Sequence, residues 1–114
     1  MGVADLDRAE TFYRDTLGLS LEREDRPFAL IFDVQGTMLR VTGVGEVKPV
    51  PYTVLGWEVP DIRATVQALQ TRGVTTERYK GLQQDELGIW RSPSGGQVAW
   101  FKDPDGNTLS VTQF

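Results

Sequence analysis

The side chains that most often carry out catalysis or bind metals are largely absent from this chain of 114 residues. It contains no histidine and no cysteine. Imidazole acid–base catalysis, thiolate nucleophiles, structural zinc clusters, disulfides and a serine triad all need one of these residues. An intrinsic metal site would therefore have to use oxygen ligands, and the chemistry that remains is that of carboxylates, hydroxyls, amides, amines and guanidinium groups.

Glu58 and Lys102 are the charged side chains with the clearest chemical options. Glu58 would serve as a general base if it were buried, and the simpler alternative is a carboxylate that pairs with Arg40 or is partly solvated. Lys102 has the amine that a Schiff base requires, but it directly precedes a turn sequence and is expected in solvent. The sequence predicts no catalytic residue.

Aromatic side chains are the other distinctive group, with three Trp, three Tyr and five Phe. Such rings stack on flat or cationic ligands. Successive side chains of a strand point to opposite faces, so each strand predicts one packed set and one set facing a cavity. The residues predicted to line a ligand cavity are Met38, Arg40, Val54, Glu58, Tyr79, Trp90, Val98, Trp100 and Ser110. Trp90 could equally fill a dimer contact.

Composition limits the class of partner. Twelve Lys and Arg against sixteen Asp and Glu give a net charge of −4 with no basic stripe, which argues against nucleic acid and mildly favours a cationic ligand. No apolar run is long enough to span a bilayer, and Met1–Asp7 lacks the apolar stretch of a signal peptide. We therefore expect no membrane partner and a cytoplasmic location.

A short internal repeat organises the chain. Val3-Ala4-Asp5-Leu6 recurs about half a chain later as Val59-Pro60-Asp61-Ile62. The Asp of each copy is a suitable N-cap, an amphipathic helical pattern follows, and a glycine, Gly18 or Gly73, ends it. Two amphipathic helices are predicted, each covering one face of a sheet.

Short β-type runs separated by turn residues follow each helical pattern. Those of the first half are 19–24, 28–34 and 37–42, with a hairpin at Gln35-Gly36, and those of the second are 52–59, 75–79, 87–91, 97–102 and 108–114. The fold class predicted is α+β, a single domain over 1–114 with paired βαβββ modules at about 1–43 and 52–114 and a linker at about 44–51. The opening strand of the first module is short or missing, since only Met1–Ala4 precede the helix cap.

Three motifs in combination resemble one superfamily. They are Val3-Ala4-Asp5-Leu6-Asp7-Arg8-Ala9-Glu10-Thr11-Phe12-Tyr13 with Leu17-Gly18-Leu19, then Gly56-Trp57-Glu58-Val59-Pro60-Asp61-Ile62, then Trp100-Phe101-Lys102-Asp103-Pro104-Asp105-Gly106-Asn107-Thr108-Leu109. This pattern is similar to the vicinal oxygen chelate superfamily, which includes glyoxalase I, extradiol dioxygenases and bleomycin-resistance proteins. The resemblance implies a U-shaped half-barrel, usually dimeric.

In enzymes of that superfamily a divalent metal is held by His, Glu or Gln from the strands that open and close each module. Carried over by position, the ligand sites fall on Arg40, Val54 and Ser110, and the first falls at or before Met1. A guanidinium, a pair of methyl groups and a hydroxyl do not make a set of hard ligands, so we expect no catalytic metal and no cofactor. An upstream segment that supplied the first ligand would not restore the other three.

The resemblance and the residues together favour a binding protein of the glyoxalase/bleomycin-resistance type, which takes an aromatic or cationic small molecule into a dimer-assembled cavity without metal catalysis. One alternative is a lyase, isomerase or dioxygenase of the same superfamily with an atypical oxygen-ligand site. Another is a structural or regulatory dimer with an empty cavity. The partner expected besides the ligand is a second copy of the chain, because a module without its opening strand exposes a sheet edge; exchange of elements between the copies stays open.

Overall fold

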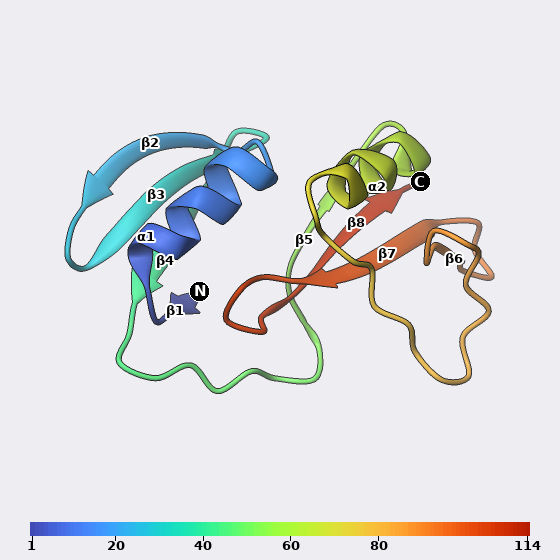
Figure 1. The fold of residues 1–114 in the computed structure, drawn as a ribbon. Coiled ribbons are helices and arrows are strands. Elements are labelled where there is room, and N and C mark those ends of the chain that lie inside the picture. Colours follow the sequence, from blue (N-terminus) through green and yellow to red (C-terminus); the bar gives the residue numbers. More distant parts are fainter. The chain divides into compact units, whose positions relative to one another are not determined.

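Two compact units make up the computed structural model, which describes all residues from Met1 to Phe114. Unit 1 comprises Met1–Pro49 together with Asp103–Asp105, and unit 2 comprises Val50–Lys102 and Gly106–Phe114. Each unit contains a four-stranded sheet with helical structure packed on it (Figure 1). The predicted α+β class with βαβββ modules is confirmed.

The helical segment of unit 1 begins where the sequence predicts. Asp5 caps α1 (Leu6–Glu10), because its Oδ1 accepts hydrogen bonds from the backbone N–H groups of Asp7 at 2.9 Å and Arg8 at 3.1 Å. The segment then continues as a wider π-type helix, η1 (Thr11–Thr16), in which the N–H of Leu17 donates to the carbonyl of Phe12. The periodicity of the sequence predicted the helix but not this widening.

The sheet of unit 1 has the strand order β1-β4-β3-β2. Its strands are β1 (Gly2–Val3), β2 (Ser20–Asp25), β3 (Ala29–Val34) and β4 (Thr37–Gly43). The predicted hairpin between β3 and β4 is confirmed, with φ of 52° at Gln35 and 85° at Gly36, the conformation that a tight two-residue turn requires. The predicted short opening strand is also confirmed: β1 pairs only Gly2 with Thr42 and Val3 with Gly43.

The core of unit 1 lies between this sheet and α1, which contacts β3 and β4. Leu30 and Phe32 from β3 and Val41 from β4 are fully buried, and Tyr13 from η1 is buried with them. The ring of Tyr13 lies 5.8 Å from that of Phe32. The alternation of buried and less buried residues along β3 therefore marks the face that the helix covers.

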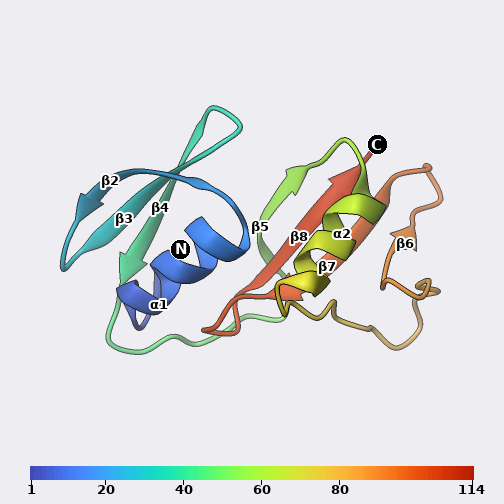
Figure 2. The same ribbon diagram turned by 45° about the horizontal axis from the view of Figure 1, so that its top comes forward.

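Unit 2 repeats this arrangement with the strand order β5-β8-β7-β6. Its elements are β5 (Thr53–Glu58), α2 (Ile62–Thr71), β6 (Trp90–Arg91), β7 (Gln97–Lys102) and β8 (Thr108–Gln113). Asp61 caps α2 by accepting from the N–H of Ala64 at 3.1 Å, and α2 packs on β7 and β8 (Figure 2). Its apolar residues Ile62, Val66 and Leu69 are buried against the sheet.

Two predicted strands of the second half are wrong or shortened. Residues 75–79 form no strand and contribute only an isolated bridge between Thr76 and Phe101. The strand predicted over 87–91 is reduced to Trp90–Arg91.

Side chains explain why this segment leaves the sheet. The amide of Gln84 accepts from the N–H of Tyr79 and donates to the carbonyls of Glu77 and Gly88, each at 2.8 Å. The Oδ1 of Asp85 accepts from the N–H groups of Leu87 and Ile89, each at 2.9 Å. Because these side chains form hydrogen bonds with the backbone N–H and carbonyl groups of the segment, those groups need no neighbouring strand as a partner.

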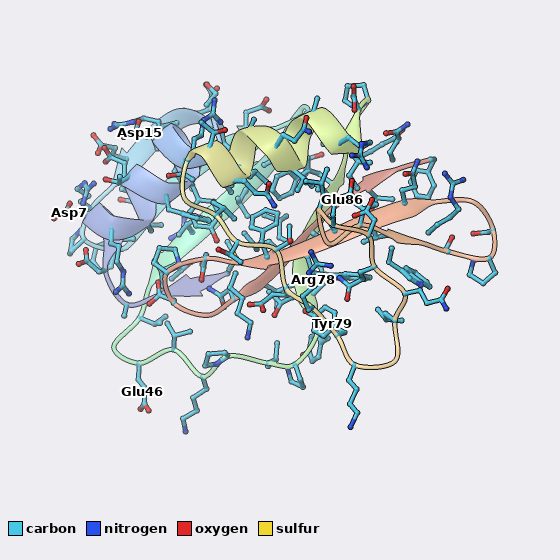
Figure 3. All side chains as sticks on the ribbon, turned by 45° about the vertical axis from the view of Figure 1, so that its right-hand side comes forward. Asp7, Asp15, Glu46, Arg78, Tyr79 and Glu86 are labelled. Atoms are coloured by element: carbon cyan, nitrogen blue, oxygen red, sulfur yellow. The ribbon has the colours of Figure 1, made fainter.

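The remaining stretch, 44–51, contains neither helix nor strand, and Glu46 projects outward from it (Figure 3). No helix in the structure is both long enough and apolar enough to cross a membrane.

Candidate functional site

The face of each sheet that turns away from that unit's own helix carries the chemically distinctive side chains. We call it the distal face, and we call the sheets of units 1 and 2 sheet 1 and sheet 2. In sheet 2 the pairing of β5, β8, β7 and β6 puts Gly56, Ser110 and Trp100 in one row of this face and Glu58, Thr112, Val98 and Trp90 in the next. The predicted site residues Glu58, Trp90, Val98, Trp100 and Ser110 thus share the distal face of sheet 2.

The opposite face of sheet 2 packs under α2, as the sequence alternation predicts. Leu55, Leu109 and Phe101 form one row there, and Trp57, Val111 and Ala99 form the next. Trp57 meets Phe101 edge to face, with ring centroids 6.0 Å apart. Of the three tryptophans, Trp57 therefore belongs to the packed side of the sheet.

Three aromatic residues from separate segments meet beside the distal face of sheet 2, and we call them the aromatic cluster: Tyr79, Trp90 and Trp100. The rings of Tyr79 and Trp100 are 5.4 Å apart in an edge-to-face arrangement, and those of Trp90 and Trp100 are 6.0 Å apart and tilted by 35°. Tyr79 comes from the segment that follows α2 (Figure 3) and is 37% exposed. Burial of its ring, aided by the Glu77 carboxylate, raises the pKa of the Tyr79 phenol, so the cluster carries no negative charge at neutral pH.

Ser110 occupies a tight position on the same face. It is buried, and a Cβ added to Gly56 would lie 2.6 Å from its Oγ and 3.7 Å from Cγ2 of Thr53. Only a residue without a side chain leaves room for the Ser110 hydroxyl at this point of the sheet. Gly56 therefore lets β5 and β8 pair closely in the row that also carries Trp100.

Val54 lies at a register shift in β5, where strict alternation of side chains between the two faces does not predict which face a residue takes. The ladder pairs Thr53 with Thr108 and Leu55 with Leu109, so Val54 is an extra residue in a bulge of β5. Its side chain is 39% exposed. The prediction that Val54 lines a cavity stays a prediction.

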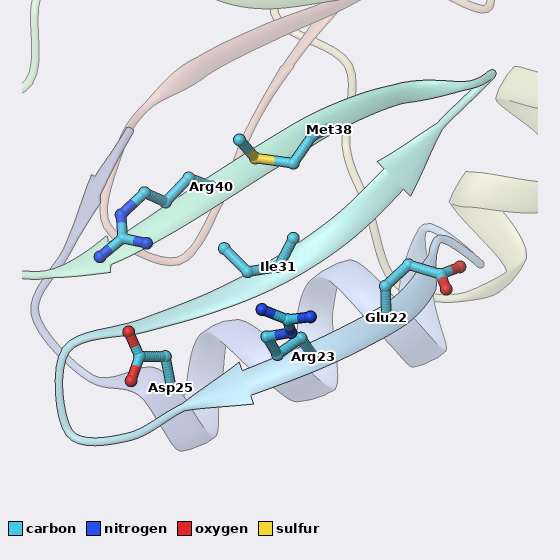
Figure 4. A pocket seen from close by; sticks show the side chains of 6 residues that line it. All are labelled: Glu22, Arg23, Asp25, Ile31, Met38 and Arg40. Atoms are coloured by element: carbon cyan, nitrogen blue, oxygen red, sulfur yellow. The ribbon is translucent and has the colours of Figure 1, made fainter.

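A depression with a volume of about 510 Å³ lies on the distal face of sheet 1 (Figure 4). It is lined by Glu22, Arg23, Asp25, Ile31, Met38 and Arg40. Met38 and Arg40 were predicted from the sequence as ligand-binding residues, and they lie here together on β4; Met38 is 64% exposed. The sequence reasoning missed Glu22, Arg23, Asp25 and Ile31; the run 20–25 has one apolar residue, Leu21, so alternation gave no signal for which of its charged side chains share a face.

The residues that stand where the enzymes of the resembling superfamily hold a metal do not fit one. Arg40 offers a cationic guanidinium, Val54 only methyl groups, and Ser110 a hydroxyl packed over Gly56. No group of three or more Asp and Glu side chains in the structure is arranged to hold a metal ion. This donor chemistry does not suit a divalent cation, which prefers several carboxylate or imidazole ligands.

A polar cluster lies inside unit 1, and it includes two acids of the turn sequence that follows Lys102. The Tyr13 hydroxyl donates to Oδ2 of Asp103 at 2.8 Å, and Oδ1 of Asp103 accepts from the N–H of Asp105 at 2.9 Å. Burial, together with the Asp103 and Asp105 carboxylates, raises the pKa of the Tyr13 phenol far above its usual range. The phenol is thus a hydrogen-bond donor at neutral pH and into the alkaline range.

Asp105 binds the start of α1. Its Oδ1 accepts from Nη2 of Arg8 at 2.8 Å and from the N–H of Ala4 at 3.2 Å, while its Oδ2 is buried without a partner. The Asp-Pro-Asp sequence between β7 and β8 therefore contributes three residues to unit 1 rather than only a surface turn. A buried acid at each end of a turn, each opposite a donor, is a tertiary pattern that no local sequence signal predicts.

The comparisons with known proteins agree with this architecture. A family model described as the Glyoxalase/Bleomycin resistance protein/Dioxygenase superfamily matches residues 1–111. No curated protein matches the chain.

Solved structures resemble it over nearly their whole length. A member of the glyoxalase/bleomycin resistance protein/dioxygenase superfamily from Sphaerobacter thermophilus is 25% identical, with a TM-score of 0.73 over 100% of this chain and 94% of that one. A lactoylglutathione lyase from Agrobacterium tumefaciens is 20% identical, with a TM-score of 0.76 over 99% and 88%. A glyoxalase family protein from Bacillus anthracis is 14% identical, with a TM-score of 0.77 over 98% and 88%. At these identities the last two likenesses concern the fold.

Proposed function

Because this chain belongs to the glyoxalase/bleomycin resistance protein/dioxygenase superfamily, we propose that it binds a small aromatic or cationic molecule without metal-dependent turnover. The proposed site is the aromatic cluster of Tyr79, Trp90 and Trp100 beside the distal face of sheet 2. Glu58, Val98, Ser110 and Val54 complete the proposed lining there. Met38 and Arg40, on β4 of unit 1, stay predicted ligand-binding residues and are not part of this proposed site. The proposed assembly is a homodimer.

The aromatic cluster is the observation that carries this proposal. The Trp100 ring has the rings of Tyr79 and Trp90 within 6.0 Å of it, so the three offer flat, electron-rich surface, and Tyr79 remains partly exposed. Aromatic faces attract flat ligands by stacking and cations through the ring quadrupole. The net charge of −4 adds a weak general preference for a cation over an anion at this cluster.

Binding without turnover is proposed because the site lacks the parts of a catalyst. The positions that correspond to metal ligands in related enzymes hold Arg40, Val54 and Ser110, and no histidine is available as a base. Glu58 is the one acid of the distal face of sheet 2, and no second titratable group with a complementary role lies in its row. Sequestration of a compound needs only shape, stacking and desolvation, all of which side chains of these types provide.

The first experiment titrates the protein with three probes of matched size: N-methylquinolinium as a flat cation, quinoline as its neutral counterpart, and hexyltrimethylammonium as a cation without a ring. We expect the flat cation to quench tryptophan fluorescence and raise the melting temperature most. Trp100→Ala is expected to weaken its binding at least about tenfold, because stacking and cation–π contacts to the central ring are lost.

Tyr52→Ala is the matched control, since Tyr52 is 64% exposed and lies outside the aromatic cluster. It should leave the affinity unchanged. Equal binding by Trp100→Ala and the unchanged protein would refute the aromatic cluster as the site. Stoichiometric, tightly bound iron, manganese, nickel or zinc in the purified protein, measured by mass spectrometry, would instead support an enzyme with an atypical metal site.

A further inference from the structure

The depression on the distal face of sheet 1 has a charge pattern that the aromatic cluster does not share. Arg23 on β2, Ile31 on β3 and Arg40 on β4 are direct partners in the ladder, so their side chains form one row across three strands. Figure 4 shows the two guanidinium groups on either side of Ile31. Two cations thus flank one apolar side chain in the centre of the sheet.

Neither guanidinium has a partner inside unit 1. The arginines of this unit that form ion pairs are Arg8, Arg14 and Arg26, each with Asp or Glu at 3.1 Å or less. Arg23 and Arg40 form no side-chain hydrogen bond or ion pair there. Because this unit pairs its other arginines, the two on the distal face are available for a ligand.

The two acids that line the depression, Glu22 and Asp25, form no ion pair with the arginines of the Arg23–Ile31–Arg40 row. Glu22 is the extra residue of the bulge between Leu21 and Arg23, its carboxylate accepts from Oγ of Ser20 at 2.7 Å, and it points toward the opposite end of β2 from Asp25 (Figure 4). Asp25 lies at the end of β2 and makes no ion pair with either arginine. Because Asp25 lines the same depression, its negative charge opposes the binding of an anion there without occupying either guanidinium.

The spacing suits a small anionic group. Residues two strands apart in a sheet have backbones about 10 Å apart, and extended arginine side chains span most of that gap from both sides. A guanidinium presents a planar fork of N–H donors that matches the oxygens of a carboxylate or a phosphate. Ile31 and Met38 add an apolar floor for a short hydrocarbon attached to that group.

From this arrangement we infer a second ligand site in unit 1, in which Arg23 and Arg40 bind the carboxylate or phosphate of a small molecule whose apolar part lies on Ile31 and Met38. This inference goes beyond the proposed function, because it assigns an anionic group to the distal face of sheet 1. It does not depend on the aromatic cluster, so either proposal can fail alone.

The experiment follows the methyl resonances of Met38 and Ile31 by nuclear magnetic resonance during titration with four six-carbon probes: hexanoate, hexyl phosphate, hexanamide and hexylammonium. We expect the two anions to shift these resonances in a saturable way, and the amide and the ammonium not to do so at the same concentrations. Tighter binding of hexanoate identifies a carboxylate ligand, and tighter binding of hexyl phosphate a phosphate ester. Added salt should weaken both.

Three variants make the test specific. Arg40→Gln and Arg23→Gln should each weaken anion binding by about tenfold, because each removes a charge-assisted hydrogen bond. Asp25→Asn should strengthen it, since a negative charge that repels the anion is removed. The matched control is Arg91→Gln on β6, outside the depression, which should bind as the unchanged protein does.

Equal shifts with hexanoate and hexylammonium, or an unchanged anion affinity in both Arg40→Gln and Arg23→Gln, would overturn the inference. Circular dichroism of each variant separates a lost site from a lost fold. The Ile31 resonance of the folded Arg40→Gln protein then reports directly on the site.

Discussion

Tyr13 joins the apolar core of unit 1 to its buried acids. Its ring packs against Phe12 at 5.2 Å and Phe32 at 5.8 Å, while its hydroxyl donates to Asp103 at 2.8 Å. Since Asp103 comes from the loop between β7 and β8, this one side chain holds a distant part of the sequence in unit 1. A hydrogen bond from a buried phenol to a carboxylate is among the stronger ones in a protein.

Tyr13→Phe should therefore lower the free energy of unfolding by about 1.5–3 kcal/mol, because it removes a hydrogen bond to a charged group without changing the packing of the ring. Chemical denaturation followed by circular dichroism measures this change. Tyr52→Phe is the matched control and should have little effect, since Tyr52 is 64% exposed. An equal loss in both variants would contradict the assigned role of Tyr13.

The same residue predicts how stability depends on alkaline pH. Burial and the neighbouring carboxylates raise the pKa of the Tyr13 phenol in the folded protein, whereas in the unfolded chain the phenol ionises near pH 10. The stabilisation is thus complete below about pH 10 and is lost as the pH rises above it, because only the unfolded chain releases the proton. Unfolding free energies measured across this range should fall less steeply for Tyr13→Phe.

At the scale of elements, both helices begin at an Asp N-cap, but they differ in the side chains that accept hydrogen bonds from their first backbone N–H groups. Asp5 satisfies two backbone N–H groups at the start of α1. Asp61 satisfies one at the start of α2, where Oε1 of Gln113 accepts from the N–H of Ile62 at 2.8 Å. The start of α2 is therefore held by two side-chain acceptors, from Asp61 and Gln113, whereas Asp5 is the acceptor at the start of α1.

Asp5→Ala should consequently destabilise the protein more than Asp61→Ala does, within the range of about 0.5–2 kcal/mol that is typical of a lost N-cap. Urea denaturation of the two variants gives the comparison, and unchanged slopes would show that the unfolded state is unaffected. A larger loss for Asp61→Ala would mean that Gln113 does not support the cap of α2.

Strands were predicted correctly where nearby turn residues and the alternation of side chains mark their ends. The run 97–102 and the hairpin at Gln35-Gly36 are formed as expected. The strand predicted over 75–79 was wrong because side chains that follow it take the place of strand partners. Gln84 accepts from the backbone N–H of Tyr79, and Asp85 accepts from that of Leu87 in the next segment. A side chain that replaces a ladder partner leaves the local pattern of apolar residues unchanged, so periodicity does not reveal it.

At the scale of the whole molecule, the short first strand bears on assembly. β1 pairs only with Thr42 and Gly43, although β4 begins at Thr37, whereas β5 of unit 2 pairs with five residues of β8. The edge of β4 before Thr42 is thus not paired within the sheet of unit 1, apart from the N-terminal amine that donates to the carbonyl of Arg40 at 3.1 Å. Unpaired strand edges favour association with another chain.

We therefore expect a homodimer at micromolar concentration, measured by sedimentation velocity and equilibrium. The dimer should persist at high salt, because backbone pairing and apolar contacts are screened less than surface charges. A single species with the mass of one chain, 12.7 kDa, throughout the micromolar range would contradict this expectation.

The sequence by itself determined the α+β class, the paired modules, both helix caps and the absence of histidine and cysteine chemistry, because these depend on residue type and on short-range spacing. It also indicated Trp100, Trp90 and Tyr79, whose rings the structure brings together. Only the tertiary structure decided that Arg23 lies in register with Arg40, that Val54 lies in a bulge, and that Asp103 and Asp105 belong to unit 1. Register and long-range hydrogen bonds depend on residues far apart in the chain, and no local pattern encodes them.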